Sequence, residues 1–275
     1  MEVNRKHRLH EMGLDAMITD AELRRKSSQK NIRLDLIEKD YILGWIIYGI
    51  SKTSKKDQIA FKGGTALSKI YFPLNWRISE DLDFTITGSA TTKELSESMI
   101  NEIPENVIEQ SNGIRVEYRD HHINNDFLRL RFAVEGPITR HTARAHYDYP
   151  DFNINTYTLE NILAEKIRSM IERDKIRDYY DTWRLLQIEP IDHNLTASLF
   201  QKKCEGKGIK YRNINQILPE DIKDTLQPYY DSELLRLTGN TMPSLETIIQ
   251  ELSMELRNLN LSEIISENIN SPSTS

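Results

Sequence analysis

The sequence predicts an α+β fold in which a mixed β-sheet core is flanked by N-terminal helices and followed by a C-terminal helical lobe. Apolar residues recur at helical spacing over residues 32–51, and short alternating runs typical of strands lie between residues 59 and 149. After Thr158 helical patterns dominate. We therefore divide the chain into a core with its N-terminal helices at 1–150, a helical region at 151–270 and a loose tail at 271–275.

Local signals place the individual elements. Pro73 ends the helix that follows the first strand, because proline cannot continue a helix. Thr91 and Glu94 form a capping box, and Thr158 is a natural N-cap. We expect helices at 14–26, 32–51, 65–71, 91–109, 179–186, 195–204, 218–226 and 244–260. We expect strands at 59–61, 81–87, 114–119, 127–134 and 142–149.

Composition excludes several classes of protein. The 275 residues carry a formal net charge of −6, which argues against non-specific coating of nucleic acid but leaves room for a local basic groove. Cys204 is the only cysteine, so an intramolecular disulfide and a cysteine-based zinc site are excluded. The sequence has no signal-peptide pattern and no apolar stretch of membrane-spanning length, so we expect a cytoplasmic protein that does not enter a membrane.

Gly63, Gly64 and Thr65 form a turn between the first strand and the next helix. Glycine has no Cβ, so the backbone turns sharply there and approaches a ligand closely. We expect Thr65 to cap the helix and to present its hydroxyl to a phosphate oxygen, because the amides of a helix N-terminus favour an anion. Taken alone, the three residues are better explained as an ordinary strand–turn–helix junction.

Two carboxylates follow the glycine turn along the chain. Asp81 and Asp83 alternate with Leu82 and Phe84, so in a strand both carboxylates project to the same side. Close like charges need a cation or a proton between them. Magnesium prefers carboxylate and phosphate oxygens as ligands. A strand edge or an Asp-rich turn would explain an isolated pair, but behind a glycine turn the pair indicates a magnesium–nucleotide site.

A third metal-binding carboxylate is expected on a neighbouring strand. Asp148 is our candidate, because it lies at the end of the strand-like run at 142–149. Asp126 and Glu135 are alternatives. Asp148 would otherwise cap the loop that follows it.

These segments resemble the AbiEii/AbiGii toxin family of nucleotidyltransferases, within the polymerase-β-like superfamily. The resemblance spans residues 30–190. Sixteen residues separate Gly64 from Asp81, more than is usual in the superfamily, and the inserted segment 72–77 accounts for the difference. The motifs that carry the resemblance are Glu38-Lys-Asp-Tyr41, Phe61-Lys-Gly-Gly-Thr-Ala-Leu-Ser-Lys-Ile-Tyr71, Arg77-Ile-Ser-Glu-Asp-Leu-Asp-Phe84, Thr158-Leu-Glu-Asn-Ile-Leu-Ala-Glu-Lys-Ile-Arg168 and Arg177-Asp-Tyr-Tyr-Asp-Thr-Trp183.

The resemblance implies a nucleotidyltransferase-type sheet core and transfer of a nucleoside monophosphate from an NTP, with pyrophosphate released. It also implies an RNA acceptor, most specifically a tRNA 3′ end, and a toxin of a toxin–antitoxin or phage-defence system with a cognate antitoxin. By motif position the functional candidates are Ser79, Asp81, Lys166 and Asp181, with Asp83 beside them and Asp178 as an alternative to Asp181.

General chemistry fits these roles. Asp81 and Asp83 would hold Mg²⁺, and Lys166 would offset charge on the transferring phosphoryl group. Arg77 and Ser79 join the glycine turn as nucleotide-binding candidates, although Ser79 is equally a candidate for regulatory modification.

Structural explanations compete with the two later candidates. For Lys166 the structural explanation is a side chain that lies along an apolar stripe. The functional interpretation would place Lys166 and Arg177 on one face if their helix is continuous. Asp181 would form a salt bridge with Arg177.

Two other functions compete with RNA modification. One is nucleotidylylation of a protein hydroxyl, which the acidic net charge mildly favours because binding a long nucleic acid relies on many basic contacts. The other is a catalytically inactive module that binds a nucleotide or an antitoxin. The presence of Asp81, Asp83 and Lys166 argues against the inactive module.

Overall fold

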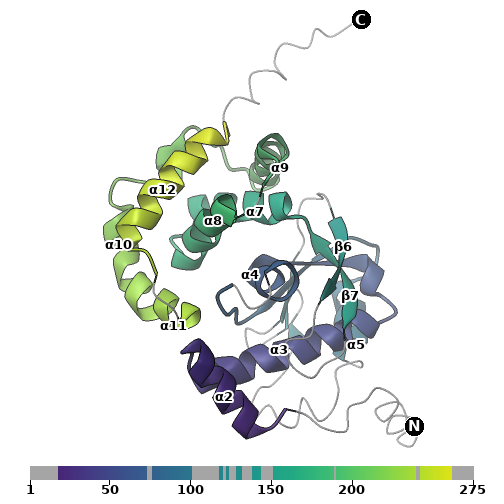
Figure 1. Ribbon diagram of the computed structural model, residues 1–275. Coiled ribbons are helices and arrows are strands. Elements are labelled where there is room, and N and C mark those ends of the chain that lie inside the picture. The colour runs from purple at the N-terminus through teal and green to yellow at the C-terminus, as the bar shows by residue number, and fades with distance from the viewer. Residues whose placement is uncertain are drawn as a thin grey trace, which may run out of the picture. The chain divides into compact units, whose positions relative to one another are not determined.

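The chain folds into two compact units, each with its own architecture (Figure 1). The computed structural model describes residues 18–72, 76–100, 151–188, 190–239 and 242–261, together with strand residues 118–119, 122–123, 128–131 and 138–143. The sheet unit comprises Met1–Phe132, Ile138–Thr156 and Leu237–Asn240, and the helical unit comprises Ala133–Pro137, Tyr157–Arg236 and Thr241–Ser275. The combination confirms the predicted α+β class.

Two helices open the described part of the sheet unit, α2 (Asp20–Lys30) and α3 (Leu34–Lys52). Thr19 caps α2 by accepting a hydrogen bond from the N–H of Glu22, whose carboxylate bonds back to the Thr19 N–H. Every residue of α3 from 41 to 51 is buried. A helix that is enclosed on all sides is a core element, so α3 belongs to the interior of this unit.

A mixed seven-stranded sheet forms the rest of the core, with strand order β3-β4-β5-β2-β1-β7-β6. β1 pairs antiparallel with β2 and parallel with β7, and β2 pairs parallel with β5. The β1–β2 register sets Lys62 opposite Asp83, so the residues after Lys62 lie beside β2. The strand bounds are β1 (Ile59–Lys62), β2 (Leu82–Ile86), β3 (Tyr118–Arg119), β4 (His122–Ile123), β5 (Leu128–Arg131), β6 (Ile138–Ala143) and β7 (Phe152–Tyr157).

Short helical elements link the strands of this sheet. The 3₁₀ turn η1 (Lys56–Gln58) precedes β1, and α4 (Gly63–Ala66) with the π turn η2 (Leu67–Tyr71) follows it. The helix α5 (Thr92–Ile100) follows β2 and begins at the predicted Thr91–Glu94 capping box. The continuation of α5 that we predicted toward Glu109 lies outside the described residues.

The strand β7 is the main element that sequence reasoning missed. Its side chains alternate as in a half-buried strand, since Phe152, Ile154 and Thr156 are buried while Asn153 is exposed. Asparagine is depleted in strands, and two asparagines in this segment hid the pattern. The strand predicted at 142–149 overlaps β6 only at residues 142–143, because β6 is Ile138–Ala143. Residues 144–149 lie outside the described residues.

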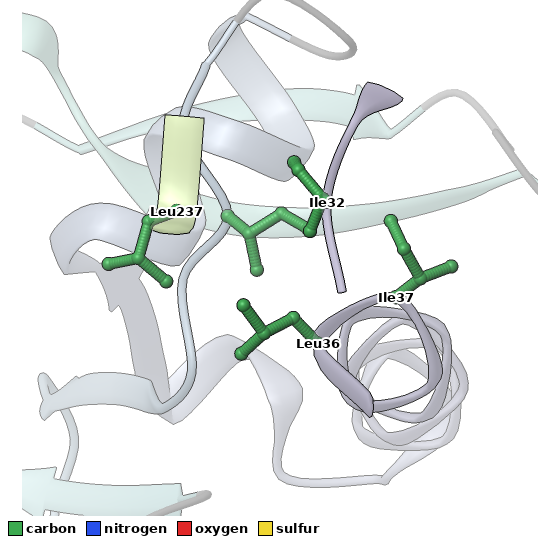
Figure 2. Close-up of a cluster of buried hydrophobic side chains, with 5 residues drawn as sticks. Ile32, Leu36, Ile37 and Leu237 are labelled. Atoms are coloured by element: carbon green, nitrogen blue, oxygen red, sulfur yellow. The ribbon is translucent and has the colours of Figure 1, made fainter. Parts of the chain in front are cut away.

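A segment from near the C-terminal end of the described chain completes the sheet unit. Leu237 packs in a buried cluster with Ile32, Leu36, Ile37 and Ile78, and Figure 2 shows four of these side chains converging. The backbone N–H of Ile78 donates to the carbonyl of Leu237 at 2.9 Å. Residues 237–239, which we call the return segment, therefore hold the chain immediately before Ser79.

Gly239 of the return segment tolerates no side chain. Its φ is +65°, and an added Cβ would lie 2.1 Å from the carbonyl oxygen of Lys30. Gly208, in the helical unit, has a similar φ of +67° but open space around it, so it is a matched control.

We expect Gly208→Ala to lower the free energy of unfolding by about 1 kcal/mol, the cost of a left-handed alanine. Gly239→Ala should cost about 1–3 kcal/mol more, because it also overpacks the Lys30 backbone. Denaturant unfolding of both variants measures the difference. Equal losses would mean that the return segment moves away without cost.

The helical unit begins with α7 (Leu159–Glu172), and Thr158 caps it by accepting from the Asn161 N–H, as predicted. α7 packs against α8 and α9, and α8 packs against α12 (Figure 1). None of the described helices is long and apolar enough to cross a membrane. The remaining elements are α8 (Ile176–Ile188), α9 (His193–Glu205), η3 (Ile214–Gln216), α10 (Ile222–Tyr229), the π turn η4 (Tyr230–Leu234), α11 (Leu235–Thr238) and α12 (Leu245–Asn258).

Candidate functional site

The glycine turn lies directly against three of the predicted site residues. Gly63 has a φ of +78°, and a Cβ added there would lie 3.0 Å from Oδ2 of Asp83. A Cβ added to Gly64 would lie 2.7 Å from Nη2 of Arg77 and 3.1 Å from Oγ of Ser79. Both positions therefore require glycine for close approach. The structure brings the turn, the cation and the carboxylate of the predicted nucleotide site into one place.

Thr65 has a different role from the predicted one. The helix begins at Gly63, two residues earlier than expected, and its N-cap is Lys62, which makes no side-chain capping bond. The Thr65 side chain is buried, and its hydroxyl donates to the backbone carbonyl of Asp81. The prediction that Thr65 caps the helix is therefore wrong. Its hydroxyl instead fastens the start of β2 to the helix after the glycine turn.

Asp83 lies on β2, and Asp81 immediately precedes the strand. Leu82 and Phe84 are fully buried, while the two aspartates are half-buried, which is the alternation that the sequence predicted. The phenylalanine ring packs against that of Phe61 on β1, with centroids 5.1 Å apart. This packing fixes the face of β2 that carries the carboxylates.

The donor set at β2 suits a magnesium ion that is also bound by a nucleotide. Magnesium takes one or two protein carboxylates and completes its octahedron with phosphate oxygens and water. Asp83 supplies one such carboxylate directly beside the glycine turn, and Asp81, two residues earlier, is the candidate for the second. No group of three or more acidic, histidine or cysteine side chains that could hold a metal ion occurs within the described ranges. The predicted third ligand Asp148 and its alternatives Asp126 and Glu135 lie outside those ranges.

Arg77 and Ser79 are buried where they meet the glycine turn. The Arg77 Nη1 donates to the carbonyl of Ile78 at 3.1 Å, which directs the guanidinium along its own backbone. The guanidinium group suits phosphate recognition, so Arg77 beside the glycine turn is a candidate partner for an anionic ligand.

A buried ion pair that sequence reasoning did not assign supports the same turn. Lys69 Nζ lies 2.7 Å from Oδ1 of Asp40 and donates to the Asp40 carbonyl at 2.9 Å. Burial lowers the pKa of Lys69, and the Asp40 carboxylate opposes that shift. The pair ties the π turn η2 to α3. Both residues stand in the motifs quoted above, so their motif membership was the available signal.

A second group of predicted residues meets within the helical unit. Lys166 Nζ lies 2.7 Å from Oδ1 of Asp178 and 2.9 Å from Oδ2 of Asp181. Arg173 Nε approaches the other oxygen of Asp178 at 2.9 Å. The exposed fractions of the side chains are 12% for Lys166, 2% for Asp178 and 0% for Asp181. This is a buried network of two carboxylates that share one ammonium.

The charges in this network control the protonation of Asp178. Burial by itself would raise the Asp178 pKa, but the attraction of Lys166 and Arg173 outweighs it and leaves the pKa below its ordinary value. Asp178 and Asp181 thus both contact Lys166, and neither replaces the other.

The helix bounds rule out one arrangement that the sequence offered for Lys166. α7 ends at Glu172 and α8 begins at Ile176, so Lys166 and Arg177 are not on a continuous helix. Arg177 forms an ion pair with Glu233 at 2.7 Å, and Asp181 forms one with Lys166 at 2.9 Å. The ion pairs join neighbouring helices, a geometry that spacing along one helix does not predict.

Comparisons with known proteins agree with the motifs and the fold. A model of the family described as nucleotidyl transferase AbiEii toxin, type IV toxin–antitoxin system, matches residues 45–251, well over half of the chain. Solved structures that match include MenT4, a nucleotidyltransferase toxin from Mycobacterium tuberculosis H37Rv, with a TM-score of 0.60 and 17% identity over 92% of this chain and 97% of that chain. At this identity the likeness concerns the fold. No curated protein sequence matches this chain. The extent of the family match shows that the chain belongs to the AbiEii family of nucleotidyltransferase toxins of type IV toxin–antitoxin systems.

Proposed function

We propose that this protein transfers a nucleoside monophosphate from an NTP to an RNA acceptor, a tRNA 3′ end, in a magnesium-dependent reaction. The observation that supports it most is the glycine turn, which lies against Asp83, Ser79 and Arg77 without an intervening Cβ. A triphosphate needs close backbone approach, a cation and carboxylates for its metal ion. The sheet unit offers a glycine turn, a guanidinium and carboxylates that would serve these three needs.

Asp81 and Asp83 would hold the magnesium ion, with phosphate oxygens as its other ligands. When bound, the ion neutralises triphosphate charge and favours ionisation of the attacking hydroxyl. The chain's own contribution is to fix the carboxylates before the nucleotide arrives. Thr65 does so through the Asp81 carbonyl, and the buried neighbours Leu82 and Phe84 set the direction of both side chains.

Arg77, Ser79 and the glycine turn would bind and orient the triphosphate. Because these donors are buried beside the glycine turn, they would hold the phosphates without moving. Charge that is preorganised in this way is the main contribution of a protein to catalysis of phosphoryl transfer. Lys166 and Asp181 are proposed as catalytic residues from their motif positions. An ammonium has three N–H groups, and contacts with Asp178 and Asp181 orient it.

The decisive experiment offers each labelled NTP with magnesium to total tRNA and, separately, to total cell protein. Label should appear in tRNA and map to its 3′ end. Label only on protein would assign the protein as a nucleotidylylating enzyme of protein hydroxyls. Binding of an NTP with no transfer to either pool would indicate an inactive module.

Membership of a type IV toxin–antitoxin family implies an antitoxin partner for the protein. We propose that both act in the cytoplasm, where NTP and tRNA are present. Co-expression with the neighbouring reading frame tests the partnership, since it should relieve any growth arrest that the toxin causes alone.

A further inference from the structure

A basic surface at the end of α9 has no role in the proposed nucleotide site. Residues 202–212, which we call the basic loop, run from the last turn of the helix into the chain that follows it. Its charged side chains are all exposed except Lys203. Glu205 is its only acidic residue. The exposed cations are Lys202, Lys207, Lys210 and Arg212.

None of these four cations forms an ion pair with a carboxylate in the described part of the chain. Cations elsewhere on the surface do, as Arg33 does with Asp35 at 2.9 Å and Lys223 with Glu246 at 2.8 Å. Within the basic loop itself, the buried Lys203 approaches Glu165 at 3.5 Å. An unneutralised cluster on a protein of net charge −6 is a local positive field that the overall charge conceals.

The backbone of the basic loop is held by hydrogen bonds. The Ile209 N–H donates to the carbonyl of Cys204 at 2.9 Å. Gln216 accepts from the Arg212 N–H at 2.5 Å and donates to the carbonyl of Lys210 at 3.1 Å. The loop therefore presents its cations from a fixed position, which lowers the entropy lost on binding a partner.

The chemistry of the basic loop favours a phosphate backbone over a protein partner. Protein interfaces are built around apolar and aromatic side chains and are depleted in lysine. The large exposed hydrophobic residues of the described chain are Tyr229, Leu235 and Met254, and none lies in the loop. Gly208 has open space around it, so a polyanion can approach the backbone as well as the cations.

We infer that the basic loop binds the phosphodiester backbone of the RNA that accepts the nucleotide. This inference rests on the proposed function and adds where the helical unit contacts the acceptor. Backbone contacts carry no sequence information, so the loop supplies affinity and orientation for RNA. The base that is modified is selected elsewhere.

The test compares a variant that replaces all four cations by glutamine with a control that removes the same charge from other exposed positions. The test variant is Lys202→Gln/Lys207→Gln/Lys210→Gln/Arg212→Gln. The control is Arg25→Gln/Arg33→Gln/Lys93→Gln/Arg257→Gln. Binding of total tRNA is measured from about 50 to about 300 mM salt, a roughly sixfold range that includes the physiological value.

Each phosphate contact contributes about 0.7–0.9 to the slope of log affinity against log salt, so the loss of four contacts should make the slope of the test variant shallower by about 3–4. The KM for tRNA should rise at least about tenfold, since several contacts are lost together, while the KM for NTP stays at the wild-type value. The control should change neither. A test variant that behaves like the control overturns the inference.

Two further outcomes separate the alternatives. Wild-type protein that binds tRNA with a steep salt dependence but transfers no nucleotide would contradict the proposed function and still support the RNA surface. Unchanged tRNA binding by the test variant, together with weakened binding of polyglutamate, would assign the loop to an acidic protein and overturn the inference.

Discussion

Asp81→Asn is expected to lower the rate of nucleotide transfer by about a thousandfold or more while leaving the fold intact. A carboxylate that holds a magnesium ion contributes several kcal/mol of transition-state stabilisation, and each 1.36 kcal/mol changes the rate tenfold. The hydrogen bond at this residue runs from Thr65 to the backbone carbonyl of Asp81, which asparagine keeps. The loss should therefore appear in the rate and not in the thermal midpoint.

The matched control for Asp81 is its neighbour Glu80. The Glu80 carboxylate faces Lys39 at 3.7 Å and is partly exposed, so Glu80→Gln removes the same charge one residue away. We expect that control to retain most of the activity. Transfer of labelled nucleotide at saturating NTP, over a magnesium titration, separates the two variants. An Asp81→Asn enzyme with the wild-type rate would remove Asp81 from the metal site.

The sequence predicted the parts of this site that depend on residues close to one another along the chain. The alternation of Asp81 and Asp83 with Leu82 and Phe84 depends only on local strand geometry, and the structure reproduces it in the burial of residues 81–84. The capping box at Thr91 is likewise local, with its partner three residues away. Elements of this kind need no tertiary information.

The parts that sequence did not predict depend on contacts between distant segments. The hydrogen bond from Thr65 spans 16 residues, and the Lys69–Asp40 pair spans 29. The return segment reaches Asn31 from Gly239, 208 residues along the chain. No periodicity in the sequence reports such contacts, because they are chosen by the packing of the whole unit.

The network around Lys166 gives the second large effect, a loss of stability whose size depends on pH. Lys166→Met removes the ammonium that Asp178 and Asp181 share, while Asp178 keeps its ion pair with Arg173. Breaking a buried ion pair by removing one partner costs about 3–5 kcal/mol, because the charge of the other partner stays desolvated inside the protein. Urea unfolding at pH 7 should show a loss of this size.

The pH dependence of that loss distinguishes electrostatics from packing. In the wild type the Asp178 pKa is below its ordinary value of 3.8, so its contribution is complete above that value and disappears only as the pH falls through the lower folded pKa. In the variant only Arg173 opposes the effect of burial at Asp178, so we expect the pKa of that carboxyl in the folded state to rise above its value in the unfolded chain. The folded variant then binds protons more readily, so its stability rises as the pH falls from 7 toward 5.

The stability difference between wild type and Lys166→Met should therefore shrink on acidification from pH 7 to about pH 5, a range that lies above the ordinary aspartate pKa. Adding Asp181→Asn to Lys166→Met removes one of the two buried carboxylates that have lost the ammonium, and should recover part of the loss at pH 7 without acid. If the loss were caused by the missing methylene contacts of lysine, it would be the same at both pH values and the second substitution would not reduce it. Only the shared ammonium predicts both the acid rescue and the rescue by asparagine.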